Sequence, residues 1–383
     1  MSYNLTKEDL DYFNGEVEAA KELLKTLTLI PAPSHFEDEK AAAVKKWLED
    51  AGASGVYIDE AKNVVYEIKS ENENEAAVFM AHTDTVFPFE TPLTWREDEK
   101  NFYCPGVGDD TCSLVILLAV VKYIIAKGLK PKKNILFVAN SCEEGLGNLK
   151  GSKQIVKDFS GVLNEFYTFD GKYQAVNCTC VGSHRYKIRC TSEGGHSFGA
   201  FGNTNAIAEL ARLITDLYTV EVPEKEGTKT TYNVGIIEGG TSVNTIAQFA
   251  EMLYEYRSDD RECLQIMKAT FEEKLAAIKA SSKANFEVEL VGDRPCDGIV
   301  DRAMHRSMID RVKEVCEKYS GIPCREKSGS TDCNSASSAG VPSVCVGVYN
   351  GGGAHTREEW VEKDSIAIGL RIAAELILDK FLG

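Results

Sequence analysis

The spacing of apolar residues predicts strands and helices that alternate over the first half of the chain. Helices are expected at 8–27, 35–52, 112–126 and 149–159, and strands at 56–58, 64–68, 76–81, 134–139 and 165–169. The second helix is predicted to begin at a capping box, because Ser34 is followed three residues later by Glu37. This alternation is typical of an α/β layer with a largely parallel sheet.

The pattern changes after Gly182, where strands of alternating polarity predominate. Strands are expected at 184–190, 230–237, 250–256 and 286–290, and helix faces at Ile207, Leu210, Ile214, Leu217 and at Leu264, Met267, Phe271, Leu275, Ile278. This order, β-α-β-β-α-β, is that of the split, ferredoxin-like α+β unit. Helices at 300–319 and 365–382 and a strand at 343–348 then resume the α/β pattern. We therefore expect a small domain, 183–292, inserted between two parts, 1–182 and 293–383, of a larger one.

Composition and charge argue against some classes of partner for this protein. The formal charge of −16 argues against nucleic acid or an anionic membrane as the main partner. The most apolar stretch, 114–125, contains Lys122 and is too short to span a bilayer. The N-terminus does not resemble a signal peptide, and the twelve cysteines are scattered, so we expect reduced thiols and a cytoplasmic location.

His82 and Asp84 stand directly after the apolar run 76–81. Residues two apart on a strand point to the same face, so these side chains would lie together at the end of a buried strand. The arrangement suits a metal ligand beside a carboxylate that orients it. Such a triplet is common by chance, and it gains weight only from further clusters of the same kind.

Further acidic or histidine side chains follow apolar runs or lie in glycine-rich loops. They are Asp109 and Asp110 after Pro105–Gly108, Glu143 and Glu144 after the strand at 134–139, Asp170 after the strand at 165–169, and His355 after Gly351–Ala354. Singly, an acidic pair more often caps a helix or lines a solvated turn. Because open α/β sheets carry their sites at the carboxyl ends of strands, we expect these side chains to meet there.

Together these residues match the requirements of two divalent metal ions. Ions about 3.5–4 Å apart need one bridging carboxylate and two further ligands each. Five residues satisfy that count: His82, Asp109, Glu144, Asp170 and His355. Imidazole and carboxylate ligands suit zinc, cobalt or manganese. Glu143 then remains as a free carboxylate suited to removing a proton from water, and Asp84 remains to orient His82.

In order and spacing, these clusters resemble those of the co-catalytic dizinc peptidases and amidohydrolases. That family includes carboxypeptidase G, peptidase T, aminoacylase, acetylornithine deacetylase and succinyl-diaminopimelate desuccinylase. The matching segments are 82–86, 105–110, 143–145, 170–171 and His355, and the resemblance covers nearly the whole chain. It implies a zinc-peptidase catalytic domain with an inserted lid domain that serves dimerisation, and hence a homodimer.

The resemblance also implies an activity and a role for each residue. The activity is hydrolysis of an amide bond in a small peptide, with deacylation of an N-acyl amino acid as the alternative. Asp109 would bridge two metals, most often zinc, and the Asp109–Asp110 peptide would be cis. His82 and Asp170 would hold one ion, and Glu144 and His355 the other. Glu143 would be the general acid and base.

Three residues of the inserted domain resemble the family's lid residues. His196, in Gly194–Ser197, matches a histidine that helps to stabilise the oxyanion, often in the site of a partner subunit. Asn244 and Arg257 match residues that hold the substrate, and Arg257 could clamp a carboxylate through its guanidinium fork. The competing interpretation of Arg257 is a surface ion pair with Asp259 or Asp260.

The chain departs from the family pattern directly after the aspartate pair. The family has Lys-Gly-Gly or Lys-Ala-Gly there, whereas this chain has Thr111, Cys112 and Ser113. These residues are small enough for close packing, so we expect metal binding to persist, but they favour no single subfamily. His35, His184 and His305 are expected to lie outside the site.

Other classes of function fit the sequence less well. A non-catalytic peptide or metabolite binder would have lost ligands or the base, and here every position is filled. A nucleotide-binding enzyme is suggested by Gly145-Leu146-Gly147, but the spacing misses the dinucleotide fingerprint and two glutamates would repel a pyrophosphate. No cysteine stands beside a base, as a cysteine hydrolase would need. Substrate choice stays open, because 168–171 resembles peptidase T, which binds a free amino end, whereas the region around Arg257 resembles carboxylate-binding relatives.

Overall fold

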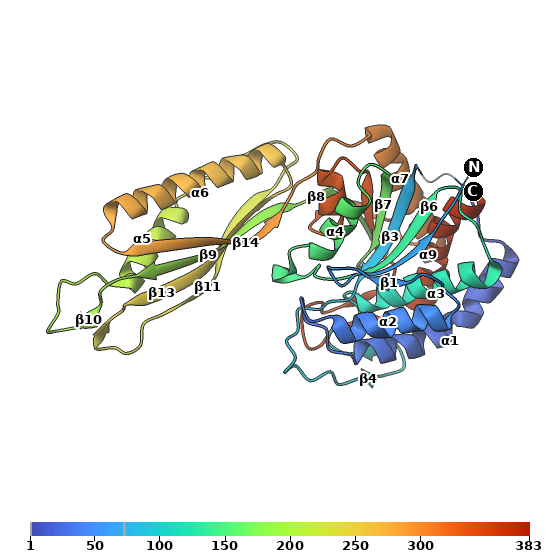
Figure 1. Cartoon of the computed structure of the whole chain (residues 1–383), viewed down its shortest axis with the longest axis horizontal. Helices are drawn as coiled ribbons and strands as arrows, with labels where there is room; N and C mark the ends of the chain where they lie inside the picture. Colours follow the sequence, from blue (N-terminus) through green and yellow to red (C-terminus); the bar gives the residue numbers. More distant parts are fainter. Residues whose placement is uncertain (1, 72–73) are drawn as a thin grey trace. The chain divides into compact units, whose positions relative to one another are not determined.

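The computed structural model describes residues 2–71 and 74–383, which form two compact units (Figure 1). The large unit joins Met1–Thr179 to Gly298–Gly383, and the inserted unit is Cys180–Asp297. The domain limits predicted from sequence, 183 and 292, lie a few residues inside those of the inserted unit. Within the described ranges, no helix is long and apolar enough to cross a membrane.

An eight-stranded sheet forms the centre of the large unit, in the order β1-β2-β6-β3-β7-β16-β8-β15. Its strands are β1 (Tyr57–Ile58), β2 (Val64–Ile68), β3 (Ala76–His82), β6 (Asn134–Asn140), β7 (Leu163–Phe169), β8 (Ala175–Cys180), β15 (Arg325–Gly329) and β16 (Ser343–Val346). The four middle strands, β6, β3, β7 and β16, run parallel, whereas β2 and β8 pair antiparallel with their inner neighbours. The predicted, largely parallel α/β sheet is confirmed.

The continuous apolar sequence of β3 reflects burial on both faces of the sheet. All seven residues of the strand are buried, and the Phe79 ring stacks on Tyr167 with centroids 4.8 Å apart. A strand covered on both sides has no polar face, so it reads as an apolar run without alternation. Strands β8 and β15 lack such a run, which explains why the apolar pattern did not reveal them.

Helices cover this sheet. They are α1 (Lys7–Thr28), α2 (Asp38–Asp50), α3 (Thr111–Lys127), α4 (Lys150–Asp158), α7 (Arg302–Ser320), α8 (Cys333–Ser338) and α9 (Ser365–Leu382), with a 3-10 turn at Gly145–Gly147. Helices α1, α2 and α3 lie together along one side of the sheet (Figure 1). Helix α3 packs against β3, α1 and α9, and nearly all its residues are buried.

The capping box predicted at Ser34 is wrong. Helix α2 begins at Asp38, and its N-cap, Glu37, makes no side-chain cap bond. The Glu37 carboxylate instead accepts the backbone N–H groups of His35 and Cys142, at 2.9 and 3.1 Å. Tertiary contacts therefore replace the bonds of the local motif: Glu37 bonds to the backbone of Cys142, and Ser34 bonds to Asp84.

A second, small sheet links the two sequence segments of the large unit. It contains β17 (Gly351–Gly352), β18 (Trp360–Glu362), β5 (Asn101–Tyr103) and β4 (Arg96–Glu97), in that order. Antiparallel pairing of β18 with β5 brings the chain after His355 next to the loop that precedes Asp109. Two segments of the predicted site are thus joined by backbone hydrogen bonds.

The inserted unit has one four-stranded antiparallel sheet, in the order β11-β13-β9-β14. Its elements are β9 (Gly182–Thr191), β10 (Gly195–His196), α5 (Ala206–Leu217), β11 (Thr230–Gly239), β12 (Thr245–Ile246), β13 (Phe249–Ser258), α6 (Arg261–Ser281) and β14 (Asn285–Arg294). Alternate residues of β9 and β13 face the two helices and form a separate core. The main elements follow the predicted β-α-β-β-α-β order, and the outer strands are the second and the fourth, as in ferredoxin-like units.

Candidate functional site

The carboxyl ends of three adjacent parallel strands bring the predicted site residues together. His82 ends β3 and lies in register with Asn140, the last residue of β6. Asp170 follows β7 directly, and the turn after β6 carries Glu143 and Glu144. Because parallel strands end at the same edge of a sheet, segments far apart in sequence meet here.

Asp109 lies between the two predicted histidine ligands. Its Oδ1 is 3.1 Å from Nε2 of His82, and its Oδ2 is 3.1 Å from Nε2 of His355. His355 Nε2 also lies 2.9 Å from Oε1 of Glu144. Among the described residues, three sets each bring their ligand atoms within 4.8 Å of one another: His82 with Asp109 and Asp170, Asp109 with Glu144 and His355, and His82 with Glu143 and Glu144. Asp109 belongs to two of these sets, as a bridging carboxylate must.

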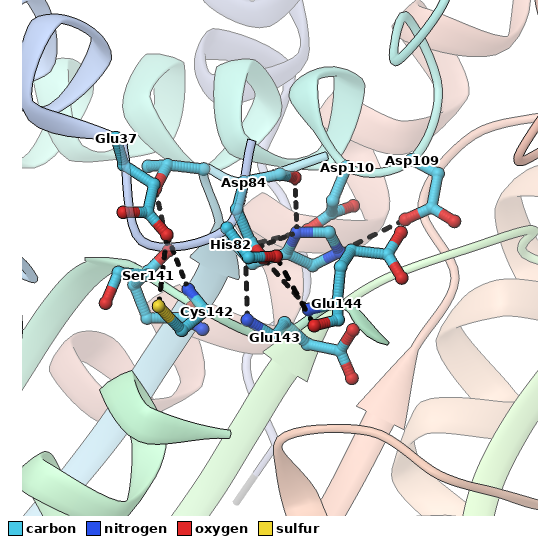
Figure 2. Close-up of polar contacts among 12 residues, drawn as sticks. Glu37, His82, Asp84, Asp109, Asp110, Ser141, Cys142, Glu143 and Glu144 are labelled. Carbon is cyan, nitrogen blue, oxygen red and sulfur yellow. Dashed lines mark hydrogen bonds and ion pairs between the residues drawn. The ribbon is translucent and has the colours of Figure 1, made fainter. Parts of the chain in front are cut away.

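The fully buried carboxylate of Asp84 ties the ends of β3 and β6 together (Figure 2). It accepts the backbone N–H groups of Glu143 and Glu144, at 2.9 and 3.0 Å, and the Ser34 hydroxyl at 2.6 Å. His82 Nδ1 lies 3.0 Å from the backbone oxygen of Asp84 and 3.4 Å from its carboxylate. With its proton on Nδ1, the His82 ring presents a lone pair on Nε2 toward Asp109.

The pKa values of the site residues indicate that the site attracts positive charge. Burial raises the pKa of Asp170 to about 7, and the charge of Asp109 adds to this rise. Hydrogen bonds that the protonated His355 ring donates to Asp109 and Glu144 raise its pKa to about 10. Burial lowers the pKa of His82, but its contacts with Asp109, Asp110 and Asp84 outweigh burial and raise it well above its usual value. A divalent cation can supply the same positive charge as these protons. Carboxylate and imidazole groups that converge in this way are suited to bind one.

The loop that carries Asp109 is held by a carboxylate that sequence analysis missed. Glu359 is 1% exposed and accepts the N–H groups of Gly106, Gly108 and Asp109, at 2.8, 2.9 and 2.7 Å. Burial raises its pKa to about 7, with the Asp109 charge adding to this effect and the amides opposing it. The Asp109–Asp110 peptide is cis, as the resemblance implies.

Asp110 does not cap the helix that it precedes. The N-cap position of α3 shows no side-chain hydrogen bond, and Asp110 Oδ2 accepts the backbone N–H of His82 at 3.0 Å. The helix-cap interpretation of the aspartate pair is therefore wrong for both members. Asp109 faces the histidines, and Asp110 holds the strand end that carries one of them.

Other contacts around the site were also not predicted from sequence. Ser34 bonds to Asp84, and Lys40 reaches the start of α3. Asn140 donates to the buried Asp332 at 2.7 Å. Each contact joins residues more than 30 positions apart, so no local spacing could have revealed it.

His196 and Asn244 lie together at one end of the inserted unit. Strand β10, which includes His196, pairs with β12, and the Ser197 N–H donates to the backbone oxygen of Asn244 at 2.9 Å. Nδ1 of the exposed His196 accepts N–H groups of Phe198 and Gly199, at 3.3 and 3.2 Å. The proton of the neutral ring is therefore on Nε2, which faces away from these bonds as a free donor.

Arg257 lies near the end of β13 in the four-stranded sheet, whereas His196 lies in the separate two-stranded sheet of β10 and β12. Because β13 begins at Phe249, the strand separates Arg257 from the His196 end by roughly 26 Å. Its guanidinium donates to both carboxylate oxygens of Glu255, at 2.9 and 3.0 Å. Of the two interpretations, the ion pair with Asp259 or Asp260 is replaced by the pair with Glu255, because Asp259 accepts the Lys229 N–H and Asp260 pairs with Lys225.

The remaining histidines and the cysteines take structural positions. His184 bonds to the Tyr256 hydroxyl at 2.7 Å, His305 to the Ser343 backbone oxygen at 3.0 Å, and the exposed His35 lies 3.4 Å from the sulfur of Cys142. All twelve cysteines are free. His35, His184 and His305 lie outside the three ligand-atom sets.

Comparison with known proteins identifies the family of this chain. The model of Peptidase family M20/M25/M40 matches residues 78–379. A putative succinyl-diaminopimelate desuccinylase of Mycobacterium tuberculosis is 24% identical over 372 residues, which cover 94% of this chain and 97% of that relative.

Solved structures share the fold. Aminopeptidase PepT of Bacillus cereus has a TM-score of 0.71 at 20% identity, covering 95% of this chain and 98% of its own. A tripeptidase of Staphylococcus aureus has a TM-score of 0.72 at 22% identity, covering 94% and 97%. Because the family model spans most of its length, the chain belongs to Peptidase family M20/M25/M40, and it is a metal-dependent hydrolase of amide bonds in small substrates.

Proposed function

We propose that the chain is an exopeptidase that cleaves small peptides at a centre of two metal ions. The observation that carries this proposal is the position of Asp109, which presents one carboxylate oxygen to His82 and the other to His355, each at 3.1 Å. A carboxylate shared in this way fits two ions and not one.

The five ligands divide into two groups around the shared carboxylate. His82 and Asp170 would hold one ion and Glu144 and His355 the other, in line with two of the three ligand-atom sets. Zinc is the metal that we propose, with cobalt or manganese as substitutes. When bound, such ions polarise the scissile carbonyl and lower the pKa of water. Asp84 orients the His82 ring.

Glu143 is the proposed general acid and base. Its backbone is fixed by the Asp84 carboxylate, and its side chain lies within reach of the ligand atoms of His82 and Glu144. A carboxylate held at the edge of the ligand set can take a proton from the attacking water and return it to the leaving nitrogen.

Removing that carboxylate tests the assignment. We expect Glu143→Ala to lose at least about 100-fold in kcat while it keeps its metal content, because general acid-base groups contribute about 10²–10⁴-fold. His82→Ala, by contrast, should lose metal. Undiminished turnover by a metal-loaded Glu143→Ala protein would remove Glu143 from the mechanism. Loss of metal from that variant would instead indicate that Glu143 is a metal ligand.

The inserted unit is proposed to complete the site as part of a homodimer. His196 offers its Nε2–H to the oxyanion, and Asn244 binds substrate beside it. Strand β13 puts roughly 26 Å between Arg257 and Phe249, at the end of the strand nearer to these two residues. One copy cannot easily bring both ends to one small substrate, which supports a partner's contribution. Sedimentation should give a dimer. The free thiols are in keeping with the proposed cytoplasmic location.

Deacylation of N-acyl amino acids is the second candidate, favoured by the desuccinylase relative and by Arg257. Arg257 is already paired with Glu255, so it can clamp a substrate carboxylate only by sharing or exchanging that partner. Di- and tripeptides compared with N-acetyl and N-succinyl amino acids, each with zinc, cobalt or manganese, distinguish the activities. Turnover of the N-acyl compounds alone would overturn the exopeptidase proposal.

A further inference from the structure

Three consecutive peptide groups in the turn after strand β6 donate to buried carboxylates. The N–H groups of Glu143 and Glu144 donate to Asp84, at 2.9 and 3.0 Å, and the N–H of Cys142 donates to Oε1 of Glu37 at 3.1 Å (Figure 2). The proposed mechanism uses Asp84 but gives Glu37 no part. Glu37 is nevertheless as fully buried as Asp84, which indicates that its carboxylate serves the turn and not the surface.

Oε1 of Glu37 accepts two hydrogen bonds from the same cysteine. Besides the N–H, the Cys142 thiol donates to this oxygen, with sulfur and oxygen 3.2 Å apart. The N–H of His35 donates to it as well, at 2.9 Å. Because a buried N–H group without an acceptor costs as much as a lost hydrogen bond, Glu37 stabilises the position that the Cys142 backbone takes.

Cys142 has a backbone conformation that its side chain disfavours. Its φ is 57°, in the left-handed region, where residues with a Cβ are uncommon and glycine is common. Such a conformation persists only where surrounding contacts hold it. Here the contacts lie on both sides of the Cα atom, because the N–H donates to Glu37 and the carbonyl oxygen accepts the N–H of Leu149 at 2.9 Å.

The conformation of Cys142 sets the direction of the two glutamates that follow it. On an extended strand, neighbouring side chains point to opposite faces. The ligand oxygens of Glu143 and Glu144 nevertheless both lie within 4.8 Å of the ligand nitrogen of His82. Cys142 is the last residue before this pair, so a change in its φ would move both carboxylates relative to β3 and β6.

The segment before α2 holds the other end of the same turn. The Ser34 hydroxyl donates to Asp84 at 2.6 Å and lies 3.3 Å from the backbone oxygen of Glu144. Residues 34–37 therefore contact the turn at Cys142 through Glu37 and at Glu144 through Ser34. Glu143 lies between these two points.

We propose that Glu37 is a positioning residue for the general acid and base: by holding Cys142 in the left-handed conformation, it keeps the Glu143 carboxylate beside the metal-ligand atoms. The proposal rests on the proposed function, because it assumes that Glu143 moves the proton. It predicts that glycine at position 142, which takes the same conformation without strain, makes Glu37 dispensable.

The experiment compares four zinc-loaded proteins: wild type, Glu37→Ala, Cys142→Gly, and the double variant. For the best substrate among the peptides and N-acyl amino acids named above, kcat, KM and zinc content are measured with zinc in excess. We expect Glu37→Ala to lose about 5- to 100-fold in kcat, the population change that matches the strain of a left-handed residue, and to keep its zinc. Cys142→Gly should keep the wild-type kcat. The double variant should recover most of what Glu37→Ala loses.

Two further variants serve as controls. Glu37→Gln keeps a carbonyl oxygen for the three donors, so it should keep most of the wild-type kcat; a loss as large as that of Glu37→Ala would refute the positioning role. Glu39→Ala removes an exposed glutamate from the same helix and should have no effect. Because Glu37 makes no side-chain cap bond, its removal leaves the capping of α2 unchanged.

The outcomes separate the two levels of inference. Absence of turnover by wild type, or undiminished turnover by zinc-loaded Glu143→Ala, would overturn the proposed function. Wild-type kcat in Glu37→Ala would overturn only the role of Glu37. Equal losses in Glu37→Ala and the double variant, or a loss of zinc in place of kcat, would show that Glu37 does not act on Glu143 through Cys142. Should Glu37→Ala fail to fold, recovery of folded, active protein by Cys142→Gly supports the proposal, and failure to recover it refutes it.

Discussion

Replacing Glu359 by glutamine tests whether one carboxylate sets the position of the Asp109 loop. Both oxygens of Glu359 accept hydrogen bonds: Oε1 from Gly108 and Asp109, and Oε2 from Gly106. Glutamine has one carbonyl oxygen and one amide nitrogen. With its oxygen at the Oε1 position, it keeps two bonds and turns an N–H group toward the N–H of Gly106.

The expected loss of folding stability follows from this count of hydrogen bonds. A hydrogen bond to a charged acceptor contributes about 1.5–3 kcal/mol, and bonds to neutral acceptors are roughly half as strong. Losing one bond and weakening two gives about 3–6 kcal/mol. Release of the buried charge offsets part of this, so we expect a net loss of about 2–3 kcal/mol. Because the folded pKa of Glu359, about 7, lies above its unfolded value of about 4.3, ionisation lowers the stability of the wild type, and the difference from glutamine narrows as pH rises through that range.

Guanidinium denaturation at about pH 8 with EDTA present measures this loss, since Glu359 is then charged. Glu358→Gln is the matched control, because Glu358 forms an exposed pair with Arg96 at 2.7 Å, worth about 0–1 kcal/mol. Hydrogen exchange over 105–109 should accelerate only in Glu359→Gln. Equal stability and equal exchange in the two variants would refute the reasoning.

The remaining predictions concern pH and metal. Burial raises the pKa of Glu165, but Lys380 and Lys133 outweigh burial and hold it below its usual value. Its stabilisation is therefore complete above the unfolded pKa of about 4.3 and disappears as pH falls through the lower folded pKa. We expect Glu165→Gln to cost about 1–3 kcal/mol in urea denaturation at neutral pH and little in strong acid; a deficit independent of pH would contradict this. Zinc at about 100 times its Kd should stabilise the protein by about 2.7 kcal/mol in the same assay, and an equal gain in His82→Ala would exclude His82 as a ligand.

The sequence revealed those parts of the fold that depend on local patterning. Burial of β3 on both faces produced an unbroken apolar run, and the site residues followed such runs at strand ends. Parallel pairing then required the ends of β3, β6 and β7 to meet, so the grouping of His82, Glu144 and Asp170 could be predicted without coordinates.

Residues that support the site were hidden for the opposite reason. Ser34 and Glu37 satisfied a local motif, yet their bonds go to Asp84 and to the backbone of Cys142. Glu359 binds a loop 250 residues away, as measured from Asp109. Periodicity and spacing describe neighbours along the chain, and they carry no information on contacts that the tertiary fold creates.

The division of the large unit into two sequence segments governs when it can be completed during synthesis. Strand β7 ends at Phe169, but its parallel neighbour β16 begins only at Ser343, and α9 packs on α3. At about 5–20 residues per second, the ribosome needs roughly 10–35 s to bridge that interval. During this time one side of β7 and the apolar surface of α3 lack these partners, whereas Cys180–Asp297 is complete in sequence and free to fold. His355 follows the other four proposed ligands in the sequence, so the nascent chain lacks the full ligand set until residue 355 has been made.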